Sequence, residues 1–331
     1  MTARSHGGPD DEGVPLHDFS SNSNACGPCP QALAAVQQAD AACYPDATYT
    51  LLRAQLADFH GVKVSRIVLA GSASEFIFRI TALAVQRGAR AVWLPPHSYG
   101  DYAQAAQAWK LPVAAGPAQA QLRWACDPSS PMGVAHAGLH QLPGGGALCV
   151  LDRAYEPLRL SGALTLTDTA LQAFWQLWTP NKALGLTGVR AAYVIAPPDA
   201  DAVVAQLEYL APSWPVGAHG VAMLQAWTLP EVQTWLTNSL ASLRDWKTRQ
   251  LALCESLGWD CLPSEANFFC AQPALPASVN LQQALAALRA QGIKLRDTTS
   301  FGLPGHVRVS VMPPAAQDAL HNAWQHLDKA T

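Results

Sequence analysis

The chain has 331 residues, half of them hydrophobic and 14 % charged, so it can bury a substantial core as one large or two ordinary domains. The formal net charge of −3 provides no basic stripe, which argues against nucleic acid and anionic membranes as partners and favours small molecules. The N-terminal residues are polar, and no segment reaches the ~18 uninterrupted apolar residues of a membrane span. We therefore expect a cytoplasmic protein.

The first two thirds of the chain predict two helices followed by alternating strands and helices. Helical apolar spacing occurs at 30–45, stopped by Pro45, and at 49–61, stopped by Gly61. The alternation of short strands with helices is typical of a mainly parallel sheet with helices on both faces. The predicted strands are 66–71, 91–96, 111–115, 122–126, 147–152, 173–178 and 191–197, and the helices between them are 72–88 and 101–110.

The last third predicts a helical stretch and then a smaller α+β unit. The helices are expected at 200–210, 220–227 and 230–258, and they are followed by strands at 266–272, 293–297 and 306–312, a helix at 281–292 and a final helix. We therefore expect an N-terminal arm over 1–30, a large α/β domain over 31–230 and a small domain over 231–331.

Two spacings resemble metal or redox sites. Cys26 and Cys29 have the CxxC spacing, but prolines surround the pair, a polar stretch precedes it, and no second ligand pair is evident. We interpret them as two thiols in a turn, with a redox or zinc site as the alternative. His136 and His140 have helical spacing but lack an acidic partner, so we predict no metal site.

Small residues follow the predicted strand 66–71 as a helix opens at Ser72, Ala73 and Ser74. Free N–H groups and the dipole at a helix N-terminus favour an anion such as a phosphate. The alternative is an ordinary serine cap, with Glu75 nearby.

Three reactive side chains stand near the ends of predicted strands, where open α/β sheets bind ligands. Lys182, in "WTPNKALGLTGVR", lies between two apolar strands, where a partly desolvated amine can form a Schiff base; a solvated turn lysine is the alternative. Asp152 ends an apolar strand and therefore requires a cation, a metal or donors. Tyr99 could stack on a flat ligand or simply pack in the core.

Thr179 and Arg190, which flank the lysine, could bind a phosphate. A phosphate cradle, an arginine, a carboxylate, a phenol and a Schiff-base lysine are together the groups that hold pyridoxal 5′-phosphate. The residues thus predict this cofactor.

The sequence resembles the fold-type I pyridoxal-phosphate enzymes, the class I/II aminotransferases, and within them the histidinol-phosphate aminotransferases and the related threonine-phosphate decarboxylases. The resemblance implies the fold of these enzymes, whose large domain has a mainly parallel sheet of the seven-stranded type. It covers nearly the whole chain through ordered segments: "DFSSNSNACGP", "YPDATYTLLR", "LAGSASE", "PHSYGDY", "DPSSPMG", "LDRAY", "TPNKALGLTGVR", "SEANFF", "GIKLRD" and "VRVSV".

The resemblance implies a role for each matching residue. Lys182 would carry the cofactor and move the proton at the substrate's α carbon, Asp152 would pair with the ring nitrogen, and Tyr155 would bond the ring's phenolic oxygen. Further cofactor contacts would come from Ala73, Ser74, Tyr99, Ser130, Thr179 and Arg190, with Tyr44 supplied by the second subunit of a homodimer. Ser130 stands where the family has asparagine. Arg308, Arg296 and Asn24 would bind the substrate.

The implied activity is transfer of an amino group between an amino acid or amino phosphate and a 2-oxo acid. One alternative is decarboxylation of threonine phosphate, suggested by "HGG" followed by "DFSSN", in which His6 could contact the substrate phosphate. A second alternative is a non-catalytic domain that binds pyridoxal phosphate, suggested by the serine at Ser130.

Overall fold

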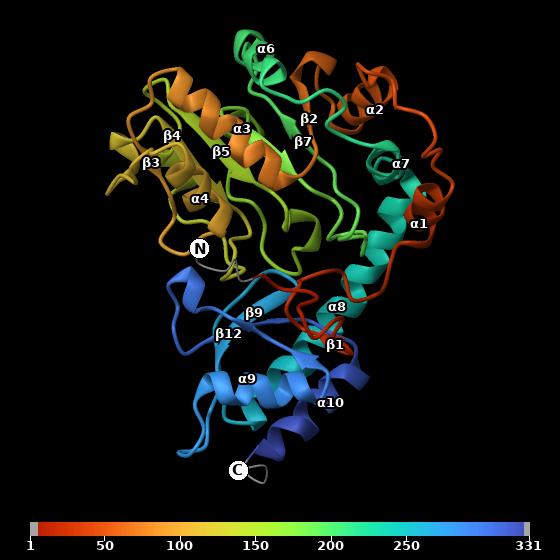
Figure 1. The fold of residues 1–331 in the computed structure, drawn as a ribbon, viewed down its shortest axis with the longest axis vertical. Helices are drawn as coiled ribbons and strands as arrows, with labels where there is room; N and C mark the ends of the chain where they lie inside the picture. The colour runs from red at the N-terminus through yellow and green to blue at the C-terminus, as the bar shows by residue number, and fades with distance from the viewer. Residues whose placement is uncertain (1–5, 328–331) are drawn as a thin grey trace.

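The computed structural model describes residues 6–327, so the first five residues of the predicted arm and the last four of the chain lie outside the described part. A six-stranded sheet with its helices forms the upper part of the molecule in Figure 1, and a four-stranded sheet with its helices forms the lower part. The long helix α8 (Pro230–Ser256) runs from one part to the other. This arrangement confirms the predicted α/β fold with a smaller α+β unit.

The large sheet is mainly parallel, with one reversed strand. Strands β3 to β6 are parallel, whereas β7 is antiparallel to both of its neighbours. β7 follows β6 through a loop and without the crossover helix that commonly joins parallel neighbours, so the chain reverses. In the spatial order β2-β7-β6-β5-β4-β3, the strands are β2 (Ile67–Ala70), β7 (Ala192–Ile195), β6 (Trp175–Trp178), β5 (Leu148–Asp152), β4 (Leu122–Cys126) and β3 (Val92–Trp93).

The large sheet has six strands where seven were predicted, and several predicted elements are shorter in the structure. The segment 111–115 contributes only an isolated bridge from Val113 beside β3, because Pro112 has no N–H to donate at this exposed edge. Helix α1 (Pro30–Gln37) ends well before residue 45. Beyond it, the Asp40 side chain accepts a 2.9 Å hydrogen bond from the backbone two residues on, a turn that competes with the helix.

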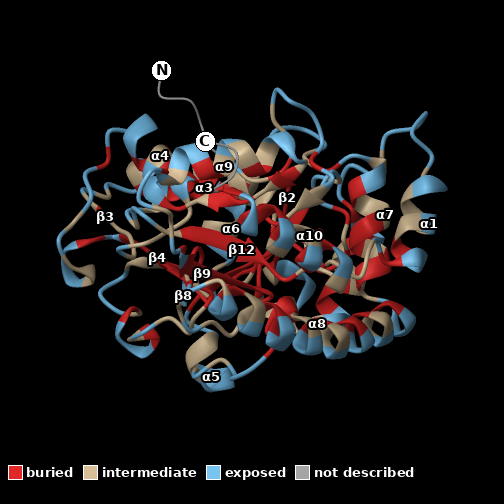
Figure 2. Cartoon of the chain, turned by 90° about the horizontal axis from the view of Figure 1, so that it is seen from below, coloured by how far each residue is buried: buried red, intermediate tan, exposed pale blue. Residues whose placement is uncertain are grey.

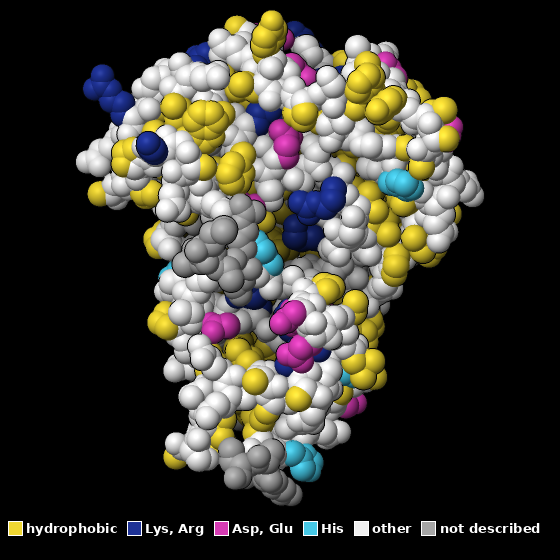
Figure 3. Space-filling view, viewed as in Figure 1, with side chains coloured by type: hydrophobic (Ala, Val, Ile, Leu, Met, Phe, Trp, Pro, Cys, Tyr) yellow, Lys and Arg dark blue, Asp and Glu magenta, His cyan; other side chains and the backbone are white. Residues whose placement is uncertain are grey.

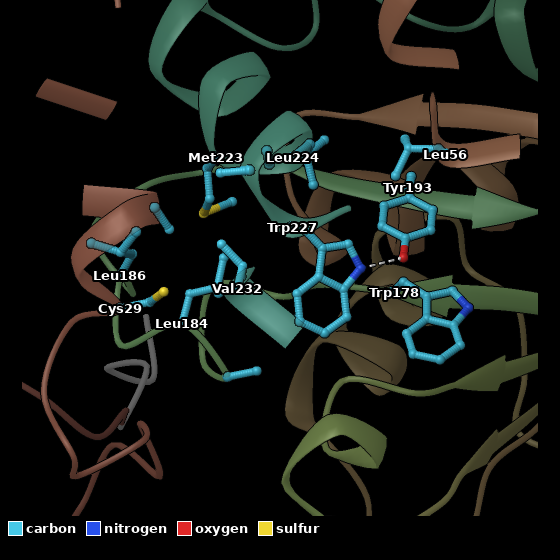
Figure 4. Close-up of a cluster of buried hydrophobic side chains, with 14 of the residues drawn as sticks. Cys29, Leu56, Trp178, Leu184, Leu186, Tyr193, Met223, Leu224, Trp227 and Val232 are labelled. Carbon is cyan, nitrogen blue, oxygen red and sulfur yellow. Dashed lines mark hydrogen bonds between the residues drawn. The ribbon is translucent and has the colours of Figure 1, made fainter. Parts of the chain in front are cut away.

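Helices cover both faces of the large sheet, so its strands are buried on both sides and read as apolar runs (Figure 2). On one face, α3 (Ala73–Gln86), α4 (Gly100–Ala108) and α6 (Asp201–Tyr209) share a core with the sheet. On the other face, α2 (Thr50–His60), α7 (Ala218–Trp227), α1 and the first half of α8 form a core containing Tyr193 and Trp227 (Figure 4). Helix α5 (Asp168–Leu171) precedes β6.

The small unit is an antiparallel sheet in the order β11-β12-β9-β8 that packs on α9 (Leu281–Ala290) and α10 (Pro314–Gln325). Its strands are β8 (Asp260–Cys261), β9 (Phe268–Gln272), β11 (Arg296–Asp297) and β12 (Val307–Ser310). The predicted strand 293–297 is split between two sheets, since β10 (Ile293–Lys294) instead pairs in parallel with β1 (His17–Asp18) of the arm. One short segment therefore contacts both the arm and the small sheet.

Helix α8 joins the two cores. Val232 and Leu236 at its start belong to the core of the large sheet, and Cys254 near its end belongs to that of the small sheet. The predicted boundary at residue 230 falls on its first residue, and the division into domains stays a prediction. Among residues 6–327, no helix is both long enough and apolar enough to cross a membrane.

Candidate active site

A cleft of about 1020 Å³ opens where the large sheet, the arm and the small sheet meet. Figure 3 shows lysine and arginine side chains gathered in the hollow between the upper and lower parts of the molecule. All the predicted site residues except Tyr44 and Asn24 line this cleft: Ala73, Ser74, Tyr99, Ser130, Asp152, Tyr155, Thr179, Lys182, Arg190, Arg296 and Arg308. The cleft lies at the carboxyl ends of β4, β5 and β6, as expected for an open α/β sheet.

Asp152 is the last residue of β5, and only 5 % of its surface is exposed. Its Oδ2 accepts a 2.6 Å hydrogen bond from the Tyr102 hydroxyl, and its Oδ1 accepts a 2.9 Å bond from the Ala154 N–H. Burial raises the pKa of this carboxyl, while the hydrogen bond from Tyr102 opposes the rise. The predicted need of this carboxylate for donors is met by these two groups.

Lys182 lies in the loop between β6 and β7, and its Nζ is 5.4 Å from the centre of the Tyr155 ring. The loop is fixed by backbone hydrogen bonds, one of them from the Asn24 N–H to the Lys182 carbonyl (2.9 Å). The Tyr155 hydroxyl accepts a 3.3 Å bond from Asn22 Nδ2. The amine and the phenol therefore lie beside each other in the cleft, near Asp152.

The residues of the phosphate site predicted at the start of α3 have two different positions. Ser72 is the helix cap, since its hydroxyl accepts the Glu75 N–H at 3.0 Å, so the alternative interpretation of this residue is confirmed. Ala73 and Ser74, the first residues of the helix, face the cleft, and Ser74 Oγ is 3.4 Å from the Tyr99 hydroxyl. Burial raises the pKa of Tyr99 to about 12, so this phenol is neutral near pH 7.

Thr179 and Arg190 complete this end of the cleft. The Thr179 hydroxyl donates to Asn181 Oδ1 at 2.7 Å, which leaves its oxygen as an acceptor for other donors. Arg190 is exposed, and its guanidinium forms no hydrogen bond or ion pair with any other residue in the described range 6–327. A cation without a partner among the described residues, in the same cleft as a helix N-terminus, makes this part of the site suitable for an anion.

Two buried arginines of the small sheet, Arg296 and Arg308, lie opposite each other on paired strands and line the cleft. Arg308 donates to Ser130 Oγ (3.3 Å) and to the Ser20 carbonyl (3.0 Å), and its buried Nε has no hydrogen-bond partner among the described residues. Arg296 donates to Ser300 Oγ at 2.8 Å, and burial lowers the pKa of its guanidinium. No carboxylate within 4 Å neutralises Arg308 in the described structure, so the pair favours an anionic ligand.

Two predicted site residues lie elsewhere. The Asn24 amide donates to the Ala183 carbonyl (3.0 Å) and to Ser239 Oγ (2.8 Å), so this side chain fastens the arm to the lysine loop and to α8. Tyr44 is 79 % exposed and stacks on Trp214, with ring centres 4.5 Å apart. It could reach a cleft only in another subunit, so its role stays a prediction.

Among the residues in or near the cleft that were not predicted, three make informative contacts. Tyr102 follows Tyr99 by three residues on α4, a helical spacing that could have indicated it. Asn22 is fully buried with a φ of 56°, and its donor position depends on this left-handed turn, which the sequence does not reveal. Phe301 lies 4.9 Å from the Arg296 guanidinium carbon and covers this arginine.

The cysteine and histidine pairs whose spacings resemble redox or metal sites lie outside the cleft residues described above. Cys26 and Cys29 are free thiols, and Cys29 is the buried residue that precedes α1. The His136 ring packs edge-on against Trp93 at 6.0 Å between centres, and His140 lies in a short turn. No group of three or more metal-ligating side chains occurs within residues 6–327.

The donor set fits pyridoxal 5′-phosphate. A helix N-terminus with a nearby arginine suits its phosphate, and a buried carboxylate held by two donors suits its ring nitrogen. The amine of Lys182 lines the same cleft. The fold and these groups define a pyridoxal-phosphate-dependent enzyme.

Comparison with known proteins agrees with this class. The family model described as aminotransferase class I and II matches residues 14–132 and 144–327, so the chain belongs to this family. This membership confirms the predicted enzyme class, an aminotransferase, and its pyridoxal phosphate cofactor.

Three similar proteins show how far the likeness extends. Histidinol-phosphate aminotransferase of Symbiobacterium thermophilum is 28 % identical over 90 % of this chain and 88 % of its own. The structure of histidinol-phosphate aminotransferase from Sinorhizobium meliloti in complex with pyridoxal-5′-phosphate has a TM-score of 0.79 and 22 % identity, over 96 % of this chain and 92 % of that one. L-threonine-O-3-phosphate decarboxylase from Porphyromonas gingivalis has a TM-score of 0.79 and 18 % identity, over 95 % and 100 % of the two chains.

Proposed function

We propose that this aminotransferase moves an amino group between an amino phosphate of the histidinol-phosphate kind and a 2-oxo acid. The observation that carries the proposal is the pair of buried arginines, Arg296 and Arg308, in the same cleft as Lys182. Their guanidinium groups suit a phosphate or carboxylate on the substrate. The relatives named histidinol-phosphate aminotransferase support phosphate as one of these groups.

The cofactor, when bound, supplies an electron sink for the electron pair left when the substrate loses its α proton. We assign the transfer of that proton to the amine of Lys182, which lines the cleft beside Tyr155. Asp152 would pair with the ring nitrogen and favour its protonated form, because a buried carboxylate is stabilised by a positive partner. Tyr155 would donate a hydrogen bond to the phenolic oxygen of the cofactor, and Tyr99 would stack on its ring.

The remaining groups would hold the phosphate of the cofactor and orient Arg308, the arginine that binds the substrate. The N-terminus of α3 at Ala73 and Ser74, the Thr179 hydroxyl and Arg190 bind the phosphate. Ser130 accepts a hydrogen bond from Arg308 and so links the cofactor side of the cleft to the substrate side.

The same proposal includes a homodimer in which Tyr44 reaches the cofactor phosphate of the other subunit. The exposed Tyr44 and Trp214 rings support it, since a stacked aromatic pair on a surface is typical of an interface. Sedimentation equilibrium should give a dimer that Tyr44→Phe leaves intact while its affinity for the cofactor falls. A fully active monomer contradicts this part of the proposal.

The main test measures amino transfer from histidinol phosphate to 2-oxoglutarate by the appearance of glutamate. Wild type is expected to turn over, and Lys182→Ala is expected to lose turnover because no other lysine among residues 6–327 lines the cleft. Lys63→Ala, which removes an exposed lysine outside the cleft, is the matched control and should keep full activity. Retained transamination by Lys182→Ala shows that the assignment of this residue is wrong.

A second candidate activity is decarboxylation of an amino acid phosphate such as O-phospho-L-threonine. The specific observation in its favour is that His6, Gly7 and Gly8 of the arm line the cleft, where the His6 side chain could contact the substrate phosphate. The measurement is carbon dioxide release from O-phospho-L-threonine by wild type and His6→Ala. Release that His6→Ala weakens supports decarboxylation, and its absence together with glutamate formation supports transamination alone.

A further inference from the structure

Tyr102 is placed so that its hydroxyl controls the carboxylate of Asp152. Its side chain is fully buried on α4, and its ring stacks on Trp124 of β4 with centres 4.3 Å apart and planes 14° apart. The hydroxyl donates to Asp152 Oδ2 at 2.6 Å. The stacked indole fixes the ring, so the hydroxyl has one direction in which to donate.

The other oxygen of Asp152 is fixed as well, by the Ala154 N–H at 2.9 Å. Two donors on two different oxygens fix the plane of the carboxylate and leave lone pairs on both oxygens for a further donor. Asp152 lines the cleft, so a donor arriving from the cleft meets a carboxylate that is already oriented. Preorientation of this kind avoids the free-energy cost of ordering the group when the ligand binds.

The electrostatics agree with this geometry. Burial raises the pKa of Asp152, and the hydrogen bond from Tyr102 is the first of the contacts that lower it, ahead of the Ala154 N–H and the charge of Lys182. Burial also raises the pKa of the Tyr102 phenol well above its usual value, so this hydroxyl stays a donor. The Cys126 thiol also faces this group, and burial keeps it protonated by raising its pKa well above the usual value.

We propose that Tyr102 is a positioning residue that keeps Asp152 ionised and aimed into the cleft, so that Asp152 can bind the protonated ring nitrogen of the cofactor. The inference rests on the role given to Asp152 under the proposed function. It assigns to Tyr102 no contact with the cofactor or the substrate. The effect of Tyr102 on ligand affinity should therefore depend on the ring nitrogen of the ligand and on no other part of it.

The test compares Tyr102→Phe with wild type in the binding of two ligands to the cofactor-free full-length protein. One ligand is pyridoxal phosphate, and the other is its carbocyclic analogue, in which a C–H replaces the ring nitrogen. Phenylalanine keeps the stack on Trp124 and removes only the hydroxyl. We expect Tyr102→Phe to weaken pyridoxal phosphate by about tenfold or more, since hydrogen bonds to charged groups have effects of this size, and to change the analogue less than about twofold.

Tyr193→Phe is the matched control, because it also removes a buried, hydrogen-bonded hydroxyl but lies outside the cleft. It should leave the preference for pyridoxal phosphate over the analogue unchanged. In an Asp152→Asn background, Tyr102→Phe should no longer alter that preference, since the group through which it acts is gone. If Tyr102→Phe does not fold, 3-fluorotyrosine at position 102, a stronger donor of nearly the same shape, should raise the preference.

The outcomes separate the inference from the proposed function. If wild type prefers pyridoxal phosphate and Tyr102→Phe keeps the full preference, the inference is overturned while the role of Asp152 stands. If wild type binds both ligands equally, the role of Asp152 fails and the inference fails with it. None of these measurements needs turnover, so they do not depend on which substrate the enzyme uses.

Discussion

His60 should make the protein sensitive to mild acid. This residue ends α2, and its Nε2 lies 2.8 Å from the hydroxyl of Tyr193, whose ring Figure 4 shows in the core beside Trp227. That hydroxyl also accepts a 3.0 Å bond from Trp227 Nε1, so it can donate its own proton to the neutral imidazole. Burial first, and the charge of Arg153 second, lower the pKa of His60 from 6.5 to about 4.

The size of the effect follows from the two pKa values. Between pH 6.5 and about 4 the unfolded chain binds a proton at this residue and the folded chain does not, so the free energy of unfolding falls as the pH falls. The contribution of His60 to stability is therefore complete above pH 6.5 and is lost progressively below it. Moving from pH 7 to pH 5 should remove about 2 kcal/mol of stability through this residue alone.

The assay is urea unfolding of the cofactor-free protein at pH 7 and pH 5, for wild type and His60→Gln. Glutamine can still accept the Tyr193 proton but does not titrate, so the variant should lose about 2 kcal/mol less than wild type between the two pH values. His140→Gln, which removes an exposed histidine, should behave like wild type. Equal losses in wild type and His60→Gln would refute the reasoning.

Three further predictions concern the cleft and its support. Arg308→Lys keeps the charge but loses the planar fork, so KM for an anionic substrate should rise about 10- to 100-fold in steady-state kinetics, and an unchanged KM contradicts the role of this arginine. Gly71→Ala would place a Cβ 2.7 Å from the Pro215 carbonyl oxygen, so thermal unfolding should show a loss of about 1–3 kcal/mol and cofactor titration a weaker affinity, whereas Gly116→Ala, with open space around its Cβ, should show neither. Asp10→Asn removes the two 2.7 Å ion pairs, with Arg289 and Lys294, that fasten the arm, so KM should rise a few-fold while kcat is kept. An unchanged KM would show that these ion pairs of the arm do not affect substrate binding.

The sequence allows the main parts of the cleft to be predicted because they lie at strand ends. Asp152, Lys182 and Ser74 each follow an apolar run, and the carboxyl ends of neighbouring strands converge at one edge of a sheet. Their approximate position therefore needs only the order of strands and helices.

Features that depend on tertiary contacts could not be predicted in the same way. Asn22, and not Asn24, bonds the Tyr155 hydroxyl. Which of the two asparagines does so depends on how the arm turns against the small sheet, where Ser310 Oγ accepts the Asn22 N–H at 2.7 Å. The reversal of β7 and the division of 293–297 between two sheets depend on which strands meet in space, and the apolar pattern of each strand is the same for either direction. Tyr102 is an exception, since its spacing from Tyr99 was visible in the sequence.

The division of 293–297 between two sheets has a practical consequence for handling this enzyme. Lys294 donates to the Gly8 carbonyl at 2.7 Å, and two residues later Arg296 reaches into the cleft. An affinity tag fused in front of the arm would adjoin arm residues that contact segment 293–297. The same five-residue segment carries Arg296, so a change in the arm could alter the position of this arginine. Kinetic constants measured with such a tag in place should therefore be compared with those of the cleaved protein before any residue is assigned a role in substrate affinity.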